Sequence, residues 1–496
     1  MIKILSVWFL VILFGTLLYC TVRLLLTARH AVYPGPIQGR LSPLYRAWLL
    51  LDGNGPIHYA NLHKKYGPVV QTGPNHYSIS DPAVISTIYD SKNQFLKSKF
   101  YNVFRLFYRG RSLESVLTAE HPEPVKHLKN ILIKNLAGCA HLFEDEVNDS
   151  VSLFMKQMRE RQGQSIDMSY WSFYWSFDLT FALLFGRHYG FMASGTDCNE
   201  WVYKSKNITD YAVLLGQRPE WCSWTLASNK FMTFIRRFQL LPDPTESLVK
   251  EIENQIREHD AKNHRCGKSL ICKVLSERPA KDIGSPQHIE AVNIIFEAFF
   301  AAAAEIAVAL TTVIYCLMRN PLTYERLVSQ LRDDTNDGSS EKAGVADNQL
   351  LTSVIKESLR LYPINPNPME RVVPSNGFET HGHFLPPGSI VSVPHYSTHR
   401  DTSIYGDDAE EFRAERWLEG DLSAIEQMDQ NFLTFGKGTR ACIGRSLAML
   451  EIRTFLTVIL ENFDIELETP KRLPKITMYW MLDYIGFNVR FRQRNI

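Results

Sequence analysis

The sequence predicts a mainly α-helical protein with small β-sheets, folded as one large domain behind an N-terminal transmembrane helix. Residues 4–22 carry no charge over nineteen consecutive positions, which matches the ~20 residues that a helix needs to cross a bilayer. Helical patterns of apolar residues dominate the rest of the chain, and its strand-like stretches are short and scattered. No internal repeat divides the main part of the chain. We therefore expect a membrane anchor at 1–26, a Pro/Gly linker at 27–45 and a single domain at 46–496.

The composition is that of a globular protein without a general affinity for nucleic acid. The chain has 496 residues, of which 45% are hydrophobic and 22% charged, so material for a large apolar core is present. Its 54 basic and 53 acidic side chains nearly cancel, and no block of lysine or arginine forms a basic tail. The cysteines show no pairing rhythm, which predicts mostly free thiols in a reducing compartment.

The N-terminal apolar run has two other interpretations, a cleaved signal peptide and a buried helix. However, the run exceeds the ~7–15 residues of a signal-peptide core, and no A-x-A cleavage motif follows it. Lys3 precedes the run, whereas arginines at 23, 29, 40 and 46 follow it, and this asymmetry favours a cytosolic body. The prolines of YPGP (33–36) then predict a stiff linker. We therefore predict a single-pass membrane protein whose large domain lies in the cytosol.

Local patterns along the large domain predict its elements in order. A strand that leads into a helix is expected at 76–90, and a buried helix ended by Gly186 is expected at 175–186. Aromatic residues among helix formers predict paired helices at 199–245. Further elements are a long helix from about Pro286 to Asn320, a polar loop at 333–344, a short helix at 352–361, strands at 377–396 and a long amphipathic helix after residue 442.

A single carboxylate interrupts the long apolar helix pattern, in the stretch FFAAAAEIAVAL (299–310). Glu305 lies near the middle of the predicted helix. A lone charge in such a place costs free energy unless it is paired or has a chemical task. The alternative is that one face of the helix is exposed to solvent.

One cysteine lies in a stretch unlike the surroundings of the others, FLTFGKGTRACIGRSLAMLE. Gly436 and Gly438 precede Cys442, and Gly444 follows it where a long helix pattern begins, so the thiol lies in a glycine-bent loop at a helix start. Backbone N–H groups and the helix dipole stabilise a thiolate there. Gly444 allows a large flat partner to approach the backbone, and Arg440 offers that partner a cation for a carboxylate. These features fit an axial ligand of haem iron, against the alternative of a buried structural cysteine.

The segment FGKGTRACIG matches the haem-binding signature F-x-x-G-x-R-x-C-x-G at every fixed position, so the chain resembles the cytochrome P-450 superfamily. The resemblance implies haem b as the cofactor, with Cys442 as the axial thiolate on the iron. It also implies that Phe435 packs beside this cysteine and that Arg440 binds a haem propionate. Arg371, in MERVVPSNG, stands where the family has a second propionate partner. The match covers nearly the whole chain and implies that residues 46–496 form a haem-binding catalytic domain with the P-450 fold.

Two further stretches, KESLR and FRAERW, resemble the family. Glu357 and Arg360 match its E-x-x-R pair, and Arg416 completes the buried structural triad that the resemblance implies. Helix geometry alone allows another interpretation, a solvated i,i+3 pair worth a few tenths of a kcal/mol. Ala414 replaces the usual proline of the second stretch, a small departure.

The chain departs from the family on the long central helix, where the family pattern is A-G-x-[DE]-T-[TS]. Glu305 matches the acid and is implied to be the catalytic acid of the oxygen-activation site. Ile306, however, replaces the threonine whose hydroxyl relays protons. Thr311 and Thr312 do not share the face of Ile306 and are not expected to substitute for it.

Three interpretations of this departure stay open. The substrate's own hydroxyl, or a water held by Glu305, replaces the threonine and monooxygenation proceeds. Alternatively, the enzyme runs oxidative coupling or desaturation, which tolerate poor proton delivery. The third interpretation is an isomerase or dehydratase that needs no O2.

A second departure lies at HPEPVKHLK (121–129), where the family has H-x-x-x-R-R and binds a propionate with an arginine. His121 fits the pattern and is expected to bind the cofactor. Val125 and Lys126 stand where the arginines are usual. Either Lys126 or Lys129 replaces the arginine, or both lie on a solvated face.

The resemblance as a whole is to the membrane-bound haem-thiolate monooxygenases of fungal specialised (secondary) metabolism. It implies an endoplasmic reticulum membrane protein that uses O2 and takes electrons from NADPH through a separate NADPH–cytochrome P-450 reductase. Phe299, Phe300, Ala303 and the segments 364–369 and 478–481 are expected to contact a small apolar, aromatic or terpenoid substrate. A haem-binding sensor without catalysis is the alternative from another class.

Overall fold

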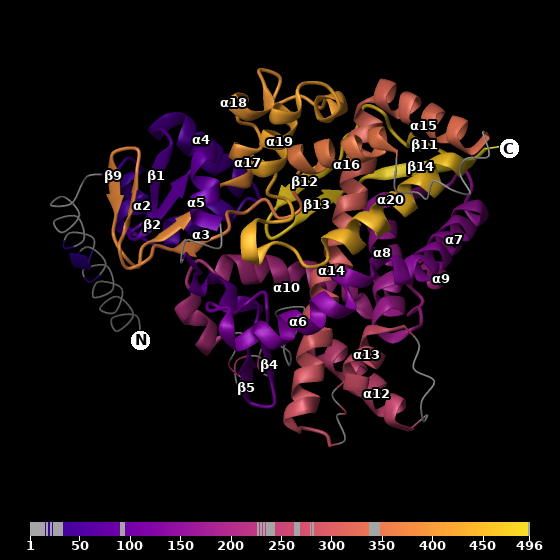
Figure 1. Cartoon of the computed structure of the whole chain (residues 1–496), viewed down its shortest axis with the longest axis horizontal. Helices are drawn as coiled ribbons and strands as arrows, with labels where there is room; N and C mark the ends of the chain where they lie inside the picture. The colour runs from indigo at the N-terminus through magenta and orange to yellow at the C-terminus, as the bar shows by residue number, and fades with distance from the viewer. Residues whose placement is uncertain are drawn as a thin grey trace, which may run out of the picture.

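The computed structural model describes residues 33–89, 95–225, 244–261, 268–277, 282–336 and 348–494, together with the single positions 15, 18, 19, 22, 228, 231, 234 and 279. In this part of the chain most residues are helical, and the strands form small sheets, as the sequence predicted (Figure 1). Apart from positions 15, 18, 19 and 22, the predicted membrane anchor at 1–26 lies outside the described residues.

Helices of very different lengths make up most of the described chain. In the first half they are α2 (Ile37–Leu41), α3 (Leu44–Leu50), α4 (Gly55–Tyr66), α5 (Ile85–Tyr89), α6 (Lys126–Asn135), α7 (Glu144–Glu160), α8 (Met168–Phe185), α9 (Phe191–Ser194) and α10 (Trp201–Leu215). In the second half they are α12 (Thr245–Ala261), α13 (Leu270–Glu277), α14 (Pro286–Arg319), α15 (Pro321–Asn336), α16 (Gln349–Leu361), α17 (His395–Thr398), α18 (Thr402–Tyr405), α19 (Leu422–Asn431) and α20 (Arg445–Asn462).

The largest described sheet brings together strands from distant parts of the sequence. Its order is β1 (Val69–Gly73), β2 (His76–Ile79), β10 (Ile390–Ser392), β7 (Arg371–Val372) and β3 (Leu96–Lys97), and β10 runs parallel to β2 with Ile390 opposite His76. A second sheet has the order β11 (Phe463–Leu467), β14 (Asn488–Gln493) and β6 (Ser165–Asp167). Three hairpins complete the set: β4 (Leu106–Tyr108) with β5 (Arg111–Leu113), β8 (Phe378–Thr380) with β9 (His383–Leu385), and β12 (Lys475–Met478) with β13 (Leu482–Ile485).

The long helix α14 passes through the middle of the fold (Figure 1). Ser285 caps it, because its side chain accepts a hydrogen bond from the N–H of His288 at 3.2 Å, and Pro286 occupies the first turn, where its missing N–H costs nothing. Among the described helices, α14 is the one long and apolar enough to cross a membrane. It is nevertheless a core helix, since 78% of its most apolar window is buried inside the protein.

Helix α8 packs along α14 and supplies much of the aromatic core. The Asp167 side chain caps its start by accepting from the N–H of Tyr170 at 3.2 Å, and Gly186 ends it in the left-handed conformation with φ 75°, as predicted. The rings of Phe177 and Phe181 lie edge-on to Phe299 of α14, with centroids 5.4 and 5.5 Å away. These contacts fix one wall of the space beside α14.

The stretch predicted to be a linker is folded onto the domain from residue 33. The backbone carbonyl of Pro34 accepts a hydrogen bond from the N–H of Gln71 at 2.7 Å, so this part of the chain lies beside the edge strand β1. Gly35 has φ +148°, and a Cβ on it would lie 2.5 Å from the Gln71 carbonyl oxygen. Only glycine fits this close approach, which explains the glycine between the two prolines.

Two of the sequence predictions need adjustment. The polar stretch 333–344 was expected to be a loop, but α15 extends to Asn336, and residues 337–347 lie outside the described part. In the region 199–245, α10 and a 3-10 turn (Pro219–Trp224) are present, and most of residues 226–243 lie outside the described residues. The strand-to-helix segment at 76–90 and the strands at 377–396 are found where they were predicted.

Candidate active site

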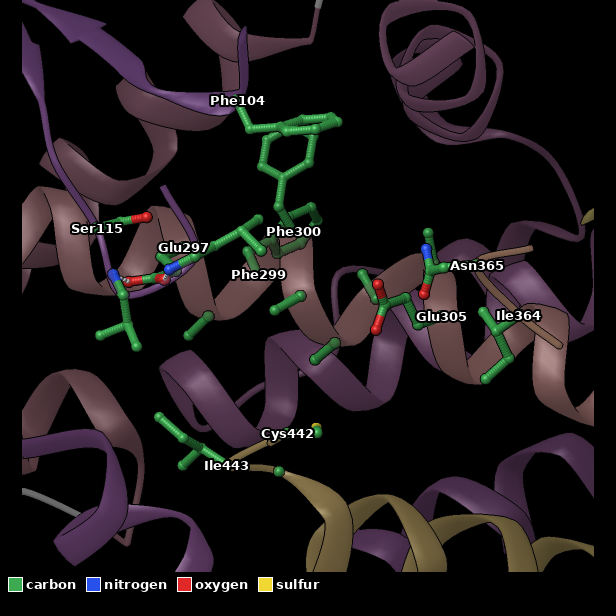
Figure 2. Close-up of a pocket in the computed structure, with 18 of the residues that line it drawn as sticks. Phe104, Ser115, Glu297, Phe299, Phe300, Glu305, Ile364, Asn365, Cys442 and Ile443 are labelled. Carbon is green, nitrogen blue, oxygen red and sulfur yellow. Dashed lines mark hydrogen bonds between the residues drawn. The ribbon is translucent and has the colours of Figure 1, made fainter. Parts of the chain in front are cut away.

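A cavity of about 490 Å³ lies between α14, the loop that precedes α20 and the segment that joins α16 to β7. Figure 2 shows Cys442 on one side of it, and Glu305, Phe299 and Phe300 on the α14 side. Of the six residues predicted to bind the cofactor or to act as the catalytic acid, five line this cavity: Glu305, Arg371, Phe435, Arg440 and Cys442. The structure thus collects into one space residues that are spread over 138 positions of the sequence, from 305 to 442.

The loop that carries Cys442 has the glycine-bent shape that the sequence predicted. Gly436 and Gly438 both have φ +66°, a left-handed conformation that a residue with a Cβ adopts only with strain. The N–H of Cys442 donates to the carbonyl of Phe435 at 2.8 Å and so closes the loop on itself. Helix α20 begins three residues after Cys442, at Arg445. The cysteine side chain is exposed, but the space that it faces is the interior cavity.

Without a bound cation the Cys442 side chain is a thiol. Burial, and then the charge of Glu305, raise its pKa to about 11, although the backbone N–H groups of Gly444 and Arg445 act in the opposite direction. A metal ion at the sulfur would deprotonate it. Among the described residues, no group of three or more His, Cys, Asp or Glu side chains is placed to hold a metal ion.

One end of the cavity is cationic, because Arg371 and Arg440 both line it. Arg371 is only 3% exposed, and its Nη1 donates to the Tyr101 hydroxyl at 3.3 Å and to the Glu370 carbonyl at 2.8 Å. Arg440 donates from Nη2 to the Glu120 carbonyl at 3.1 Å, and burial together with the charge of Arg371 lowers its pKa. No described carboxylate forms an ion pair with either guanidinium. A buried arginine beside a half-buried one favours an anionic partner, and the two carboxylates of haem meet the need.

A buried histidine at the cavity points to the same conclusion. His395 is 3% exposed and lines the cavity, and its Nδ1 lies 3.3 Å from the carbonyl of Asn365. Its Nε2 is buried without a hydrogen-bond partner among the described residues. A buried polar atom without a partner is uncommon in the interior of a folded protein, so a bound group or a water is expected to form a hydrogen bond with it. By these three tests, the thiol, the cations and the unpaired imidazole, the residues present fit haem.

Glu305 projects from the middle of α14 into the cavity, where the sequence placed it. Figure 2 shows its carboxylate next to the side chain of Asn365, which the sequence analysis did not single out as a partner. Burial raises the pKa of Glu305 to about 7, and a hydrogen bond with the Asn365 side chain opposes the shift. The carboxyl group therefore carries its proton in a substantial part of the molecules at neutral pH.

The residues after Glu305 offer no second proton relay on this face. Ile306 lines the cavity and is 6% exposed. The hydroxyl of Thr311 donates to the Ala307 carbonyl at 2.8 Å, and that of Thr312 lies 2.9 Å from the Tyr484 hydroxyl. Both threonines are engaged inside the core and neither lines the cavity.

The substrate side of the cavity is largely aromatic. The predicted contacts Phe299, Phe300, Ala303 and Met481 all line it, as does most of the segment 364–369, whereas Met478 does not. Phe104, Phe296 and Trp480 join this wall, and Phe104 and Trp480 have ring centroids 4.4 Å apart. Phe104 was not predicted, because it ends a short 3-10 helix (Lys99–Phe104), which is too brief to carry a periodic signal.

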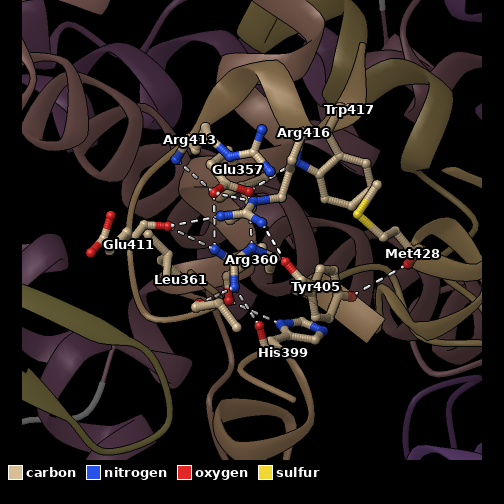
Figure 3. Close-up of polar contacts among 12 residues, drawn as sticks. Glu357, Arg360, Leu361, His399, Tyr405, Glu411, Arg413, Arg416, Trp417 and Met428 are labelled. Atoms are coloured by element: carbon tan, nitrogen blue, oxygen red, sulfur yellow. Dashed lines mark hydrogen bonds and ion pairs between the residues drawn. The ribbon is translucent and has the colours of Figure 1, made fainter. Parts of the chain in front are cut away.

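The predicted structural triad is a closed ion network in the interior, away from the cavity lining (Figure 3). Glu357 and Arg360 are each 0% exposed and Arg416 is 2% exposed. Arg360 donates from Nε and Nη2 to the two oxygens of Glu357 at 2.9 Å each, and Arg416 donates from Nε at 2.8 Å. The Trp417 indole N–H and the Arg413 backbone N–H donate to the same carboxylate at 2.9 Å each. The alternative of a solvated surface pair is therefore excluded.

The remaining N–H groups of Arg360 also have hydrogen-bond partners. Arg360 donates to the backbone carbonyls of His399, Ala409 and Glu411. These carbonyls belong to the segment between α17 and α19, so the network ties α16 to that segment. Burial raises the pKa of Glu357, but the hydrogen bond from Arg360 and the two arginine charges outweigh it, and the pKa is lowered overall.

The segment 121–129 departs from the prediction. His121 is exposed and does not line the cavity, so the structure does not bring it together with the other predicted cofactor residues. Lys126 has a side chain that is 67% exposed and lies 3.7 Å from Glu123, and Lys129 donates to the carbonyl of Thr439 at 2.6 Å. Neither lysine lines the cavity. His121 and Lys126 therefore face the solvent, whereas Val125 is buried and Lys129 binds the loop that carries Cys442.

Known proteins resemble this chain over most of its length. The model of the family described as cytochrome P-450 matches residues 36–484. The cytochrome P-450 monooxygenase mpaDE of Penicillium brevicompactum is 28% identical over 476 residues, which are 93% of this chain and 55% of that protein, so the chain spans about half the length of this relative. Cytochrome P-450 monooxygenase esdpH of Penicillium shearii is 28% identical over 93% of both chains. Cytochrome P-450 monooxygenase mfmA of Annulohypoxylon moriforme is 27% identical over 93% of this chain and 92% of that protein. The chain therefore belongs to the cytochrome P-450 family, whose members carry haem held by a cysteine thiolate.

Proposed function

We propose that the protein is a haem-thiolate monooxygenase that oxidises a small apolar, aromatic or terpenoid intermediate of fungal secondary metabolism. The observation that carries the proposal is the single cavity that joins the thiol of Cys442, the acid of Glu305 and the aromatic wall. Haem bound there would supply the oxidising chemistry, with O2 as the oxidant and NADPH as the ultimate electron donor.

The residues of the chain have separate tasks in this proposal. Cys442 would hold the iron, Phe435 would pack beside the thiolate, and Arg371 and Arg440 would orient haem through its carboxylates. Glu305 holds a proton at its carboxyl group and delivers it into the cavity, either directly or through a water. The aromatic side chains around Phe299 and Phe300 exclude bulk water and bind the apolar part of the substrate.

Glu305 should impose a pH dependence on product formation. Its pKa of about 7 means that the proton donor is present below that value and is lost as the pH rises through it. We expect turnover of the holoenzyme to fall above about pH 7. Glu305→Gln should lower turnover by roughly 10²–10⁴-fold and remove this pH dependence, because a positioned general acid contributes an effect of that size.

The matched control is Glu290→Gln, on the same helix but outside the cavity lining, which should keep both the rate and the pH profile. Product formation at saturating substrate from pH 6 to 9, with buffers of constant ionic strength, is the measurement. A Glu305→Gln profile that still falls above neutral pH would assign the titration to another group.

Ile306 should limit the coupling of the reaction, which is the fraction of consumed NADPH that yields oxidised product. Ile306→Thr places a hydroxyl beside Glu305, and a new hydrogen bond worth about 1 kcal/mol would change the partition between product and peroxide release by roughly five-fold. We expect more product per NADPH consumed and less hydrogen peroxide. Ile306→Val is the control, because valine has the shape of threonine without its hydroxyl. Equal coupling in the two variants would show that protons travel by another route.

Electrons are proposed to arrive from a separate NADPH–cytochrome P-450 reductase in the endoplasmic reticulum membrane. The anchor predicted at 1–26 would hold the protein there by a single span with the domain in the cytosol. The family membership supports a redox partner in general, and the run of uncharged residues at 4–22 supports the membrane.

The test of the proposed function is twofold. The reduced protein with carbon monoxide should show the Soret shift that marks a thiolate-ligated haem. Metabolites of a producing cell with and without this protein, grown under ¹⁸O2, should then differ by a product that carries one heavy oxygen. A product without label would favour the alternative, an oxidative coupling, desaturation or isomerisation, and would make Ile306 part of that mechanism.

A further inference from the structure

The carboxyl group of Glu305 is held by a side chain that reaches it from another part of the fold. Asn365 lies in the segment between α16 and β7 and lines the same cavity. Figure 2 shows its amide group beside the carboxylate of Glu305. The amide forms a hydrogen bond with this carboxylate, and among the described side chains it is the one that does so.

The same amide also binds the turn between β12 and β13. The Nδ2 atom of Asn365 donates to the backbone carbonyl of Trp480 at 3.4 Å. An asparagine amide carries two N–H donors on this nitrogen, so it can bind Glu305 and the Trp480 carbonyl at once. The ring centroids of Trp480 and Phe104 are 4.4 Å apart in the aromatic wall of the cavity. Asn365 therefore connects the acid on α14 to the aromatic wall.

The backbone around Asn365 is held by contacts that do not involve Glu305. The N–H of Leu482 donates to the carbonyl of Ile364 at 3.2 Å, which fixes the segment to β13. The Nδ1 atom of His395 lies 3.3 Å from the carbonyl of Asn365 itself. A side chain on a backbone fixed in this way holds its partner in one orientation.

Glu305 depends on this amide, because no described cation forms an ion pair with it. Burial raises the pKa of Glu305 to about 7, and the hydrogen bond with Asn365 keeps the pKa below the value that burial alone would give. The titratable group that interacts with Glu305 through space is Cys442, whose own pKa the charge of Glu305 raises. The other titratable groups that line the cavity do not shift the pKa of Glu305, and they are Glu297, His395, Glu451 and the cations of the end formed by Arg371 and Arg440.

We propose that Asn365 is the positioning residue for proton delivery, which holds the Glu305 carboxyl group toward the cavity and ties it to the turn that carries Trp480. The inference rests on the proposed function, because it takes Glu305 as the proton donor. A donor is most effective when its pKa lies near the working pH, since it must release one proton and take up the next. Without Asn365, burial would make Glu305 bind its proton too tightly and would leave the carboxyl group free to turn away. The contact with the Trp480 turn makes the orientation of the donor depend on the wall against which the substrate packs.

Infrared difference spectra of the full-length holoprotein test the inference without relying on turnover. The carboxyl band that is absent from Glu305→Gln reports the protonation of Glu305 across neutral pH. Carbon monoxide bound to the reduced haem is the probe of orientation, because its C–O stretching band responds to a proton donor beside it. In the unsubstituted protein both bands should titrate together, near the pKa of about 7.

Asn365→Leu removes both hydrogen bonds of the amide with little change in side-chain volume. We expect the acid dissociation constant of Glu305 to fall roughly ten- to a hundred-fold, the range for one hydrogen bond to a charged group. The C–O band should lose most of its dependence on pH. Asn367→Leu is the matched control, because the Nδ2 atom of Asn367 donates to the carbonyl of Tyr479 in the same turn but does not bind Glu305. It should leave the titration of both bands as in the unsubstituted protein.

An unchanged titration in Asn365→Leu would overturn the inference alone. An equal change in Asn367→Leu would do the same, since any loosening of the turn would then disturb Glu305. If Asn365→Leu yields no folded holoprotein, Asn365→Asp keeps the shape of the side chain, replaces its donors by acceptors and should still lower the acid dissociation constant. An unchanged constant in Asn365→Asp, or failure of this variant to fold as well, would assign Asn365 to stability and reject the inference.

The unsubstituted protein separates failure of the inference from failure of the proposed function. A C–O band that stays constant while the carboxyl band of Glu305 titrates would show that Glu305 does not deliver its proton to the haem. The role of Glu305 in the proposed function would then fall, and this inference with it. A reduced protein that binds no carbon monoxide would overturn the proposed function as a whole.

Discussion

Cys442→Ser is expected to give a folded protein that holds no thiolate-ligated haem. The serine hydroxyl stays protonated in a site where even the thiol has its pKa raised to about 11, so the metal loses its protein ligand. Loss of residues that merely support a metal ligand costs 10–100-fold, and loss of the ligand itself should reduce turnover by more than ~100-fold. Haem content per chain and the spectrum of the reduced carbon monoxide complex are the measurements.

Cys198→Ser is the matched control for this substitution. Cys198 is half-buried outside the cavity, and its sulfur lies 3.4 Å from the Ser194 hydroxyl. We expect this variant to keep its haem and the thiolate spectrum. Retention of the thiolate spectrum in Cys442→Ser would mean that another cysteine binds the iron, and the site described here would be wrong.

Glu357→Gln is expected to remove a large share of the free energy of unfolding. The substitution leaves Arg360 and Arg416 charged in the interior, at 0% and 2% exposure, without their shared carboxylate. Removing one partner of a buried pair costs about 3–5 kcal/mol, which is a large fraction of the ~5–15 kcal/mol that holds a domain together. We expect a poor yield of holoprotein and a much lower urea midpoint.

Glu123→Gln provides a control with the same chemistry and the same helical spacing. Glu123 and Lys126 also form an i,i+3 pair, but their side chains are 78% and 67% exposed and 3.7 Å apart. Solvent and salt screen such a pair, so its loss should cost less than ~1 kcal/mol. If both substitutions had equal effects, burial of the triad would not be the source of its stability.

The lowered pKa of Glu357 predicts that the protein loses stability in acid. Because the pKa of Glu357 is lower in the folded chain than in the unfolded chain, its contribution is complete above the ordinary glutamate value of 4.5. It is lost as the pH falls through the lowered value of the folded state.

The sequence was most informative where chemistry is carried by adjacent residues. The ten residues FGKGTRACIG contain the ligand and two of the glycines with positive φ, and they end directly before α20, so all of these features are local. The long helix around Glu305 was found for the same reason, because thirty-four residues of uninterrupted helical pattern leave few other structures. The E-x-x-R pair was found as a pattern, but its spacing is also that of the exposed pair Glu123 and Lys126.

Predictions stopped short where a residue's role depends on distant neighbours. His121 matched a local pattern, yet it is exposed and outside the cavity lining. Asn365 and Lys97 matched no pattern, yet one lies beside Glu305 and the other stands opposite Arg371. Their partners are separated from them by 60 and 274 positions.

The sequence by itself therefore determined the family, the thiol of Cys442, the mainly helical fold and the acid of Glu305. These follow from backbone preferences and from residue spacing within one element, which a linear pattern records. The tertiary structure alone decided which charges are desolvated, which cations face one another at the cavity and which lysines face the solvent. Desolvation and cross-strand pairing arise between segments that are distant in sequence, and their energies depend on a three-dimensional neighbourhood that no local pattern contains.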